Sequence, residues 1–347
     1  MNFYNTMHPY YCGIDLHARL LYICIIDNTG EILVHKKIKD DPDALLQLLA
    51  PYLDGIVVGV ECMHCWYWVA DFCEAHDIAF ILGHALYMRA IHGGKTKNDK
   101  IDSYKIAKLI RGGNFPLAYV YGKAMRATRD LLRRRTRIVR HGADLKAHVA
   151  NTASQYNLPP HKVNLKNVCA REQVRTHFPD PVVQRSVNLD MAILDCYHTE
   201  LKSLEAYIEQ MAKQHKPVYL HLLQSIQGIG RILALTIIYE IGDITRFPSV
   251  QQFASYARLV KCKAESAGKS YGTQGNKIGN AHLKWAFSEA AVLLLRHNRH
   301  AHCYLERLQK RMSKAKALSA LAHKLGRCVY YMLRNETVFD EARFLAR

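Results

Sequence analysis

The stretch YYCGIDLH (residues 10–17) opens a run of alternating side chains that are rich in β-branched residues. LLYICIID (20–27) and EILVHKKI (31–38) continue the run, and Asn28-Thr29-Gly30 separates these two segments. Alternation of this kind is typical of β-strands, and a short turn containing glycine joins antiparallel neighbours. The run therefore predicts two or three antiparallel strands, with Asp15 near the end of the first.

Helix and strand patterns alternate after this run. Asp41-Pro42 predicts a helix start, because a capping acid precedes proline at the first helical position. IVVGVEC has the pattern of a buried strand that ends at Glu61, and a helix follows from about Trp66. IAFILG (78–83) predicts a further strand, and the helix over 95–109 comes next. This order predicts an α/β domain with a mixed sheet, in the RNase H-like (RuvC-like) arrangement.

Four acids meet at one end of such a sheet. KTKNDKIDSYKIAKL (95–109) places Asp99 and Asp102 three residues apart on one helical face, and Asp15 and Glu61 end two strands. Carboxylates suit Mg²⁺ or Mn²⁺, which can activate a nucleophile and stabilise a leaving oxygen in phosphoryl transfer. For Asp99 and Asp102 alone, the alternative is that they are helix N-terminal acids favoured by the helix dipole.

The overall charge points to a polyanionic partner. The 347 residues include 48 Lys and Arg against 30 Asp and Glu, a formal net charge of +18. Such an excess favours nucleic acid, because Lys and Arg release the counterions condensed on phosphate. The sequence shows no signal peptide and no apolar run long enough to cross a membrane. Ten cysteines form no disulfide framework, so we expect a cytoplasmic protein with no membrane partner.

Three regions follow from composition. We predict a RuvC-like catalytic domain over 1–122, a basic helical or coiled-coil region over 123–217, and a mostly α-helical C-terminal domain over 218–347. Nine Lys or Arg residues and only two acids lie between Lys123 and Ala150. The apolar side chains of the same stretch recur at roughly helical spacing. This long helix, followed by another over about 183–215, predicts a helical hairpin that binds nucleic acid. The alternative is a solvated basic face.

The C-terminal region contains two further candidate features. Gly228 and Gly230 separate two apolar helical segments, as in a helix-hairpin-helix element whose backbone amides hold phosphate. A tight helix–helix turn is the alternative. Ser266 lies in KAESAGKSYG, a Gly-, Ser- and Lys-rich segment that leads into a helix near Gly279-Asn280. No activating base is adjacent to Ser266 in sequence, so by itself it has the character of an ordinary loop serine.

Four residues in the first region are candidate zinc ligands. Cys62, Cys65, Cys73 and His76 loosely match zinc-ligand spacing. Cys62 follows a strand end, and Cys73 and His76 fall on a helix rich in aromatic residues. Buried free thiols are therefore the favoured interpretation.

The acid-bearing segments resemble a known motif. GIDLH with Asp15, VVGVE with Glu61, and KTKNDKIDSYKIAKL resemble the DEDD motif of the Piv/MooV-type recombinases, the transposases of the one-hundred-and-ten insertion-sequence family. In the second half, the IQGIG segment and SAGKSYGTQGNKIGNAHLKWAFSEAA resemble that family's C-terminal domain. The resemblance covers about 10–115 and 220–300.

The resemblance implies a Mg²⁺-dependent site-specific DNA recombinase. Asp15, Glu61, Asp99 and Asp102 would bind the metal, and Ser266 would attack a DNA phosphate to form a phosphoserine. A non-coding bridge RNA of the element would pair with target and donor DNA. A homo-oligomer, a dimer or a tetramer, is implied, in which the acids and the serine could come from one subunit or from different subunits. The candidate nucleic-acid contacts are Lys95, Lys97, Lys100, Arg133, Arg134, Arg135, Arg137, Gly228, Gly230, Lys269, Lys277 and Lys284.

The chain departs from the family pattern in places. CMHCW follows Glu61, Ala18 stands where lysine is common, and Ala267 follows the serine where glycine is common. Ser270 is a second candidate nucleophile. Two other classes stay open: a RuvC-like nuclease that cuts branched DNA with metal-activated water, and a non-catalytic nucleic-acid-binding protein.

Overall fold

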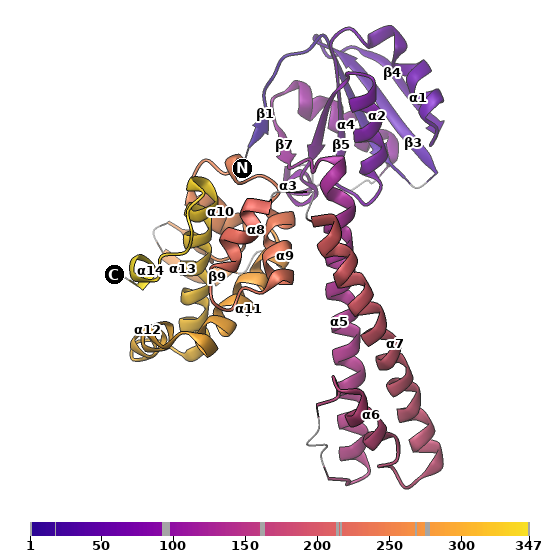
Figure 1. Ribbon diagram of the computed structural model, residues 1–347. Helices are drawn as coiled ribbons and strands as arrows, with labels where there is room; N and C mark the ends of the chain where they lie inside the picture. Colours follow the sequence, from indigo (N-terminus) through magenta and orange to yellow (C-terminus); the bar gives the residue numbers. More distant parts are fainter. Residues whose placement is uncertain are drawn as a thin grey trace. The chain divides into compact units, whose positions relative to one another are not determined.

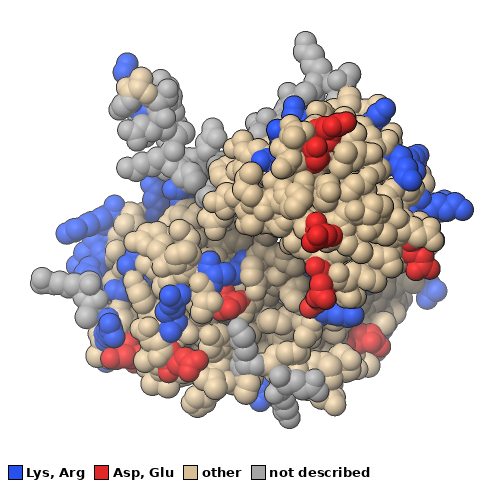
Figure 2. All heavy atoms as spheres, turned by 90° about the horizontal axis from the view of Figure 1, so that it is seen from above, with Lys and Arg blue, Asp and Glu red and all other residues tan. Residues whose placement is uncertain are grey.

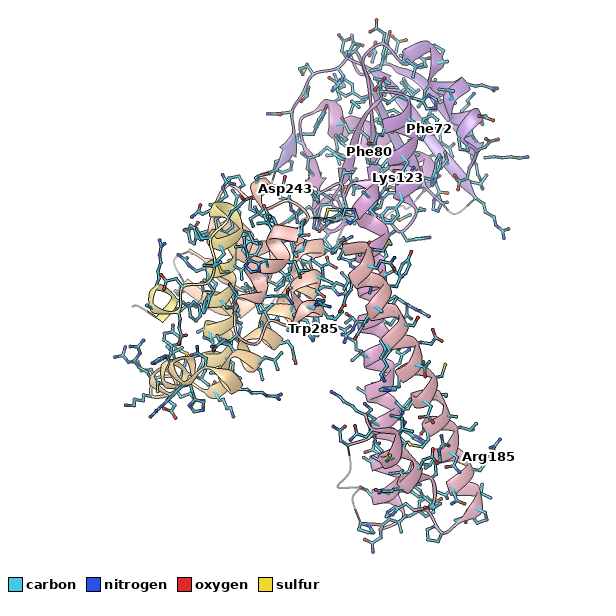
Figure 3. All side chains as sticks on the ribbon, in the orientation of Figure 1. Phe72, Phe80, Lys123, Arg185, Asp243 and Trp285 are labelled. Atoms are coloured by element: carbon cyan, nitrogen blue, oxygen red, sulfur yellow. The ribbon has the colours of Figure 1, made fainter. Side chains whose placement is uncertain are left out.

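The structure is a computed structural model that describes residues 2–17, 19–91, 98–159, 164–212, 215, 217–267, 269–274 and 278–345. The chain forms two compact units, Met1–Lys123 and Ala124–Arg347 (Figure 1). Lys123, labelled in Figure 3, is also the first residue of the long helix α5. The finer division of the chain into three regions stays a prediction.

A mixed sheet forms the centre of the first unit, with seven strands in the order β1-β7-β6-β5-β2-β3-β4. Strands β2, β5 and β6 pair in parallel, and the remaining pairs are antiparallel. The predicted mixed sheet is confirmed and is consistent with an RNase H-like domain. The two short strands β1 and β7 were not predicted. The strands are β1 (Phe3–Tyr4), β2 (Tyr10–Leu16), β3 (Leu20–Asp27), β4 (Ile32–Lys39), β5 (Ile56–Glu61), β6 (Ala79–Gly83) and β7 (Phe115–Ala118).

Helices cover both faces of this sheet. On one face, Leu45 of α1 and Trp66 of α2 share a core with Ile14 of β2. On the other face, Ile106 of α4 is in a core with Tyr11 of β2. Because side chains alternate along a strand, Asp15 lies on the α4 face with Tyr11. The helices are α1 (Pro42–Leu49), the 3-10 turn η1 (Ala50–Tyr52), α2 (Trp66–Ala75), α3 (Ala85–Ile91) and α4 (Asp99–Arg111).

The second unit begins with a helical hairpin. Helices α5 and α7 lie side by side, with the short helix α6 near the tip (Figure 1). Arg135 of α5 bonds Glu205 of α7 at 2.7 Å, and His148 of α5 contacts Asp190 of α7 at 2.6 Å. The predicted long basic helix and the helix over 183–215 correspond to α5 and α7. Their bounds are α5 (Lys123–Gln155), α6 (Val168–Arg175) and α7 (Pro181–Ala212).

The rest of the second unit is mostly helical. Helix α9 is its buried centre, and it shares one apolar core with α11 and α13 that also includes Leu132 of α5 and Ile208 of α7. The elements are α8 (Pro217–Gln224), α9 (Arg231–Ile241), η2 (Ile244–Arg246), α10 (Val250–Tyr256), β8 (Cys262–Ser266), β9 (Lys269–Gln274), α11 (Ala281–His297), α12 (Arg299–Gln309), α13 (Lys314–Asn335) and α14 (Glu341–Leu345). Among the described residues, no helix is both long enough and apolar enough to span a bilayer.

A buried carboxylate joins three helices of this unit. Glu240 of α9 is 1% exposed and accepts hydrogen bonds from Arg129 Nε at 3.1 Å and from Arg133 Nε and Nη2 at 2.6 and 2.9 Å. Asn280 Nδ2 donates to it at 2.7 Å, while Asn280 Oδ1 caps α11 through the amides of His282 and Leu283. One side chain thereby fixes α5, α9 and the start of α11.

This cluster predicts acid sensitivity of the second unit. Burial by itself would raise the pKa of Glu240, but the hydrogen bond from Arg133 and the charges of Arg129 and Arg133 lower that pKa from 4.5 to about 2. The folded-state pKa is thus depressed, so the stabilisation is complete above the unfolded-state value of 4.5 and is lost as the pH falls from there to about 2. We expect the free energy of unfolding to fall by about 3 kcal/mol over this interval because of Glu240. Urea unfolding at stepped pH, compared with Glu240→Gln, measures this contribution.

Candidate active site

Two acids lie at the carboxyl ends of neighbouring parallel strands. The parallel register pairs Ile14 of β2 with Val60 of β5. Continuing the same register places Asp15 beside Glu61, the last residue of β5. Neighbours in a parallel register lie on the same face of a sheet, so both carboxylates belong to the face that α4 covers.

Helix α4 supplies the other two acids in its first turn. Asn98 caps the helix by accepting a hydrogen bond from the Lys100 amide, and Asp99 and Asp102 follow it. Acids are favoured at this end of a helix by its dipole, so the capping interpretation is compatible with the geometry. The metal-site interpretation requires in addition that these acids lie close to Asp15, whereas the capping interpretation does not.

Glycines on the sheet allow α4 to approach closely. A Cβ on Gly13 would lie 2.3 Å from Ser103 O and 2.4 Å from Ala107 N, both backbone atoms of α4. Gly59 of β5 faces the same helix, where a Cβ would meet Ile110 Cδ1 at 2.4 Å. Each glycine stands two residues before an acid, Asp15 or Glu61, on the same face. Small residues here let the first turn of α4 reach the acids on the strands.

Substituting Gly13 with alanine should damage both the fold and the acid cluster. The new methyl group meets backbone that cannot rotate away, so α4 must shift and carry Asp99 with it. We expect a loss of about 1–3 kcal/mol in the free energy of unfolding, together with weaker Mn²⁺ binding. The control is Gly59→Ala, whose methyl group meets side-chain atoms of Ile110 and Ile81 and no backbone atom among its three nearest neighbours. Urea unfolding and a Mn²⁺ titration measure the two effects, and equal losses in both variants would contradict this account.

A histidine lies between two of the acids. His17 Nε2 is 3.3 Å from Asp15 Oδ2 and 3.4 Å from Asp99 Oδ1. Asp15, His17 and Asp99 can each present one ligand atom within 4.8 Å of the others. In the described part of the chain, this is the only such group of three His, Cys, Asp or Glu residues. His17 was missed from sequence, because its neighbour Asp99 belongs to a distant segment.

Electrostatics at Asp15 reflect this crowding. The side chain of Asp15 is 13% exposed. Burial raises the pKa of its carboxyl group; the charge of His17 opposes the rise, and the carboxylates of Asp99 and Asp102 add to it. Asp102 is therefore close enough to act on Asp15. A divalent cation would offset this concentration of negative charge.

The donor set fits a divalent metal. Carboxylate oxygens are the ligands that Mg²⁺ and Mn²⁺ prefer, and an imidazole nitrogen suits first-row transition metals as well. The structure brings together Asp15 and Asp99 directly, places Asp102 within electrostatic reach of Asp15, and places Glu61 beside Asp15 by register. The four predicted acids thus occupy one end of the sheet.

The zinc candidates do not converge in this way. Cys73 is buried, and burial raises the pKa of its thiol to about 12. Cys62 is exposed, and His76 caps the end of α2. Among the described residues, these side chains belong to no group of three potential metal ligands. Cys73 is therefore described by the buried free thiol interpretation.

Ser266 lies in the second unit, on a hairpin rather than in the predicted loop. It is the last residue of β8 and pairs with Lys269, while Glu265 pairs with Ser270. Ala267 has a φ of +51°, a left-handed conformation that glycine adopts more readily. Composition rich in Gly, Ser and Lys concealed this short hairpin in the sequence. The backbone places both candidate serines next to its turn.

The candidate nucleic-acid residues fall into distinct environments. Arg133 bonds Glu240 and Arg135 bonds Glu205, so both contribute to packing within the second unit. Arg134, Arg137 and Lys284 are exposed, as are Lys100 and Lys269. Lys95, Lys97 and Lys277 lie outside the described residues.

The turn between α8 and α9 contains Gly228 and Gly230. Gly228 has a φ of +90°, and a Cβ there would lie 2.6 Å from the Leu294 amide nitrogen of α11. Gly230 is the N-cap of α9 and is exposed, and a Cβ added to it would meet no described atom within 4 Å. The positive φ of the turn and its close packing against α11 thus require glycine at position 228. At position 230, the start of α9 has free space around it.

Comparison with known proteins places both units in context. Residues 12–158, which span the four acids, match a model for DEDD-type IS110 transposases. Residues 220–306, which include Ser266, match the Transposase IS116/IS110/IS902 family. The transposase for insertion sequence element IS1111A of Coxiella burnetii is 24% identical over 342 residues, 94% of this chain and 90% of that protein. A probable family 20 transposase of Pseudomonas aeruginosa is 23% identical over 344 residues, 94% of this chain and 97% of that protein.

Proposed function

This chain belongs to the IS110/IS116 family of transposases and is an enzyme that acts on DNA, and from this premise we propose that it is a metal-dependent, site-specific recombinase. The observation that carries the proposal is the convergence of Asp15, His17 and Asp99 within 4.8 Å at one end of the sheet. Negative charge develops on the reacting oxygens in phosphoryl transfer, and divalent cations held by such carboxylates would stabilise it.

Asp15, Glu61, Asp99 and Asp102 would hold Mg²⁺ or Mn²⁺. A bound metal supplies Lewis-acid stabilisation of the phosphate oxygens. The residues of the chain have two further tasks: they hold the carboxylates close together against their mutual repulsion, and Lys100, exposed on α4, stands ready for a DNA phosphate.

Ser266 is the proposed nucleophile. Its hydroxyl oxygen forms a bond to phosphorus while one P–O bond of the DNA backbone breaks. The hydroxyl loses its proton, and the departing deoxyribose oxygen gains one, so a phosphoserine and a free DNA hydroxyl result. Reversal with another DNA hydroxyl rejoins the strands and frees the serine. Ser270, which pairs with Glu265 on the same hairpin, is the alternative nucleophile.

Guidance and assembly complete the proposal. A bridge RNA would select target and donor DNA by base pairing, so the protein itself needs mainly backbone contacts. Arg134, Arg137 and the open start of α9 at Gly230, in a helix-hairpin-helix-like element, are suited to such contacts. The enzyme would act in the cytoplasm as a dimer or tetramer.

A covalent-adduct assay tests the serine. The full-length protein is incubated with Mg²⁺, cognate DNA and its RNA, and DNA-linked protein is separated under denaturing conditions. We expect an adduct with the unaltered protein and with Ser270→Ala, and none with Ser266→Ala. An adduct that persists in Ser266→Ala but disappears in Ser270→Ala transfers the role to Ser270. Cleavage with no adduct in any variant would support the branched-DNA nuclease instead.

A further inference from the structure

A long segment near the C-terminus carries cations without a single acid. No Asp or Glu lies between Glu306 and Glu336. The segment begins just after residue 306, where the match to the family's C-terminal domain ends. Its cations are Arg307, Lys310, Arg311, Lys314, Lys316, Lys324, Arg327 and Arg334.

Five of these cations lie within residues 307–316, around the connection between two helices of the second unit. Helix α12 ends at Gln309 and α13 begins at Lys314, and the amides of Arg311 and Met312 both bond Leu308 O in the tight connection between them. Figure 2 shows Lys and Arg side chains at the left of the face that it draws; the residues of the corner itself are taken from the sequence and from their exposure. We call the following exposed residues the basic corner: Arg307, Lys310, Arg311, Lys314 and Lys316.

Local structure accounts for part of the basic corner. Arg307, Lys310 and Arg311 lie at or just beyond the last turn of α12, where the helix dipole favours positive charge. Arg307 also stacks over the ring of Tyr304, 5.2 Å from its centroid. These three residues therefore stabilise the end of α12 without any ligand.

No comparable local stabilisation explains Lys314 and Lys316. They lie in the first turn of α13, where the dipole disfavours positive charge, and the side chain of Ser313 forms no capping hydrogen bond. Within the described residues, neither lysine forms an ion pair, and the three neighbouring cations add repulsion. The start of α13 is thus an unfavourable place for two positive charges in the free protein, and this points to an anionic partner.

We propose that the basic corner docks the phosphate backbone of double-stranded DNA, at a place separate from the acid cluster. The inference rests on the DNA-acting function proposed above. Phosphate oxygens accept hydrogen bonds from lysine, and the uncapped amides at the start of α13 favour the same anion. DNA is the favoured polyanion because the family acts on DNA, and the contact would hold flanking duplex without reading its sequence.

Salt-dependent binding by matched variants tests this surface. Lys314→Gln/Lys316→Gln is compared with Arg327→Gln/Arg334→Gln, which removes the same charge from exposed positions further along α13. Fluorescence anisotropy with a duplex, without Mg²⁺, yields affinity at several salt concentrations. The first variant should reduce the slope of log affinity against log salt by about 1.8, and the control should leave it unchanged. Binding is scored without cleavage, so the result is independent of the serine and metal assignments.

Stability provides a second readout. Removing two lysines from the start of α13 relieves repulsion, so the melting temperature of Lys314→Gln/Lys316→Gln should equal or exceed that of the unaltered protein. A lower melting temperature would make these lysines structural and overturn the proposal. Equal slope changes in both variants would also overturn it, because they would indicate only general charge attraction. A loss of affinity for RNA hairpins without a loss for duplex DNA would reject DNA as the partner.

Discussion

Replacing Asp15 with asparagine should lower the rate of DNA cleavage about a thousandfold while the fold remains intact. The amide keeps the shape of the side chain but removes the charge that a divalent metal requires beside Asp99. Metal stabilisation of a phosphoryl-transfer transition state contributes several kcal/mol, which corresponds to this loss. Single-turnover cleavage of labelled DNA measures the effect, and Asp54→Asn, an exposed acid outside the cluster, is the control.

Stability should respond in the opposite sense. Burial and the neighbouring carboxylates raise the pKa of Asp15, so its ionised form destabilises the folded metal-free protein at neutral pH. Asp15→Asn should therefore melt at the same or a higher temperature without metal, and it should lose the rise in melting temperature that Mg²⁺ gives the unaltered protein. A variant that cleaves DNA at the full rate would refute the metal-site proposal.

The second large effect concerns Glu240. Glu240→Ala should reduce the free energy of unfolding of the second unit by about 3–5 kcal/mol, because it leaves the guanidinium groups of Arg129 and Arg133 without their buried partner. It also removes the acceptor for Asn280, the cap of α11. Urea unfolding followed by far-UV circular dichroism is the measurement, since helices dominate the second unit.

A matched ion pair controls for Glu240. Glu205 bonds Arg135 at 2.7 Å but is 33% exposed, so Glu205→Ala should cost less than about 1 kcal/mol. Both substitutions break a contact between an arginine of α5 and a glutamate of another helix. Glu240 differs from Glu205 in its burial and in its further partners, a second arginine and Asn280. Equal losses from the two variants would show that burial of Glu240 has no special weight.

The sequence predicts the first unit well because its signals are local. Alternation around Asp15, the turn at Asn28-Thr29-Gly30 and the capping pair Asp41-Pro42 each depend on a few neighbouring residues. They correspond to β2, β3, β4 and α1 in the structure. The strand ends also predicted where Asp15 and Glu61 would lie relative to the sheet.

Features that depend on distant contacts were not predictable in this way. His17 gains its place in the site only when α4 docks, and nothing near His17 in sequence indicates Asp99. Glu240 belongs to an apolar helix, and its arginine partners lie in the basic helix that was assigned to nucleic acid. Strand β1 has 2 residues, too few for a period to appear.

The separation of the acids along the chain has a consequence for synthesis. Asp15 emerges from the ribosome early, but the site also needs Asp99 and Asp102 on α4, which reaches the sheet only after most of the first unit has been made. Loop closure between such distant segments is slow compared with local folding. Ser266, the proposed nucleophile, is translated later still. A nascent chain that has not reached Ser266 would therefore lack a complete set of the proposed catalytic groups, even after its acids have come together.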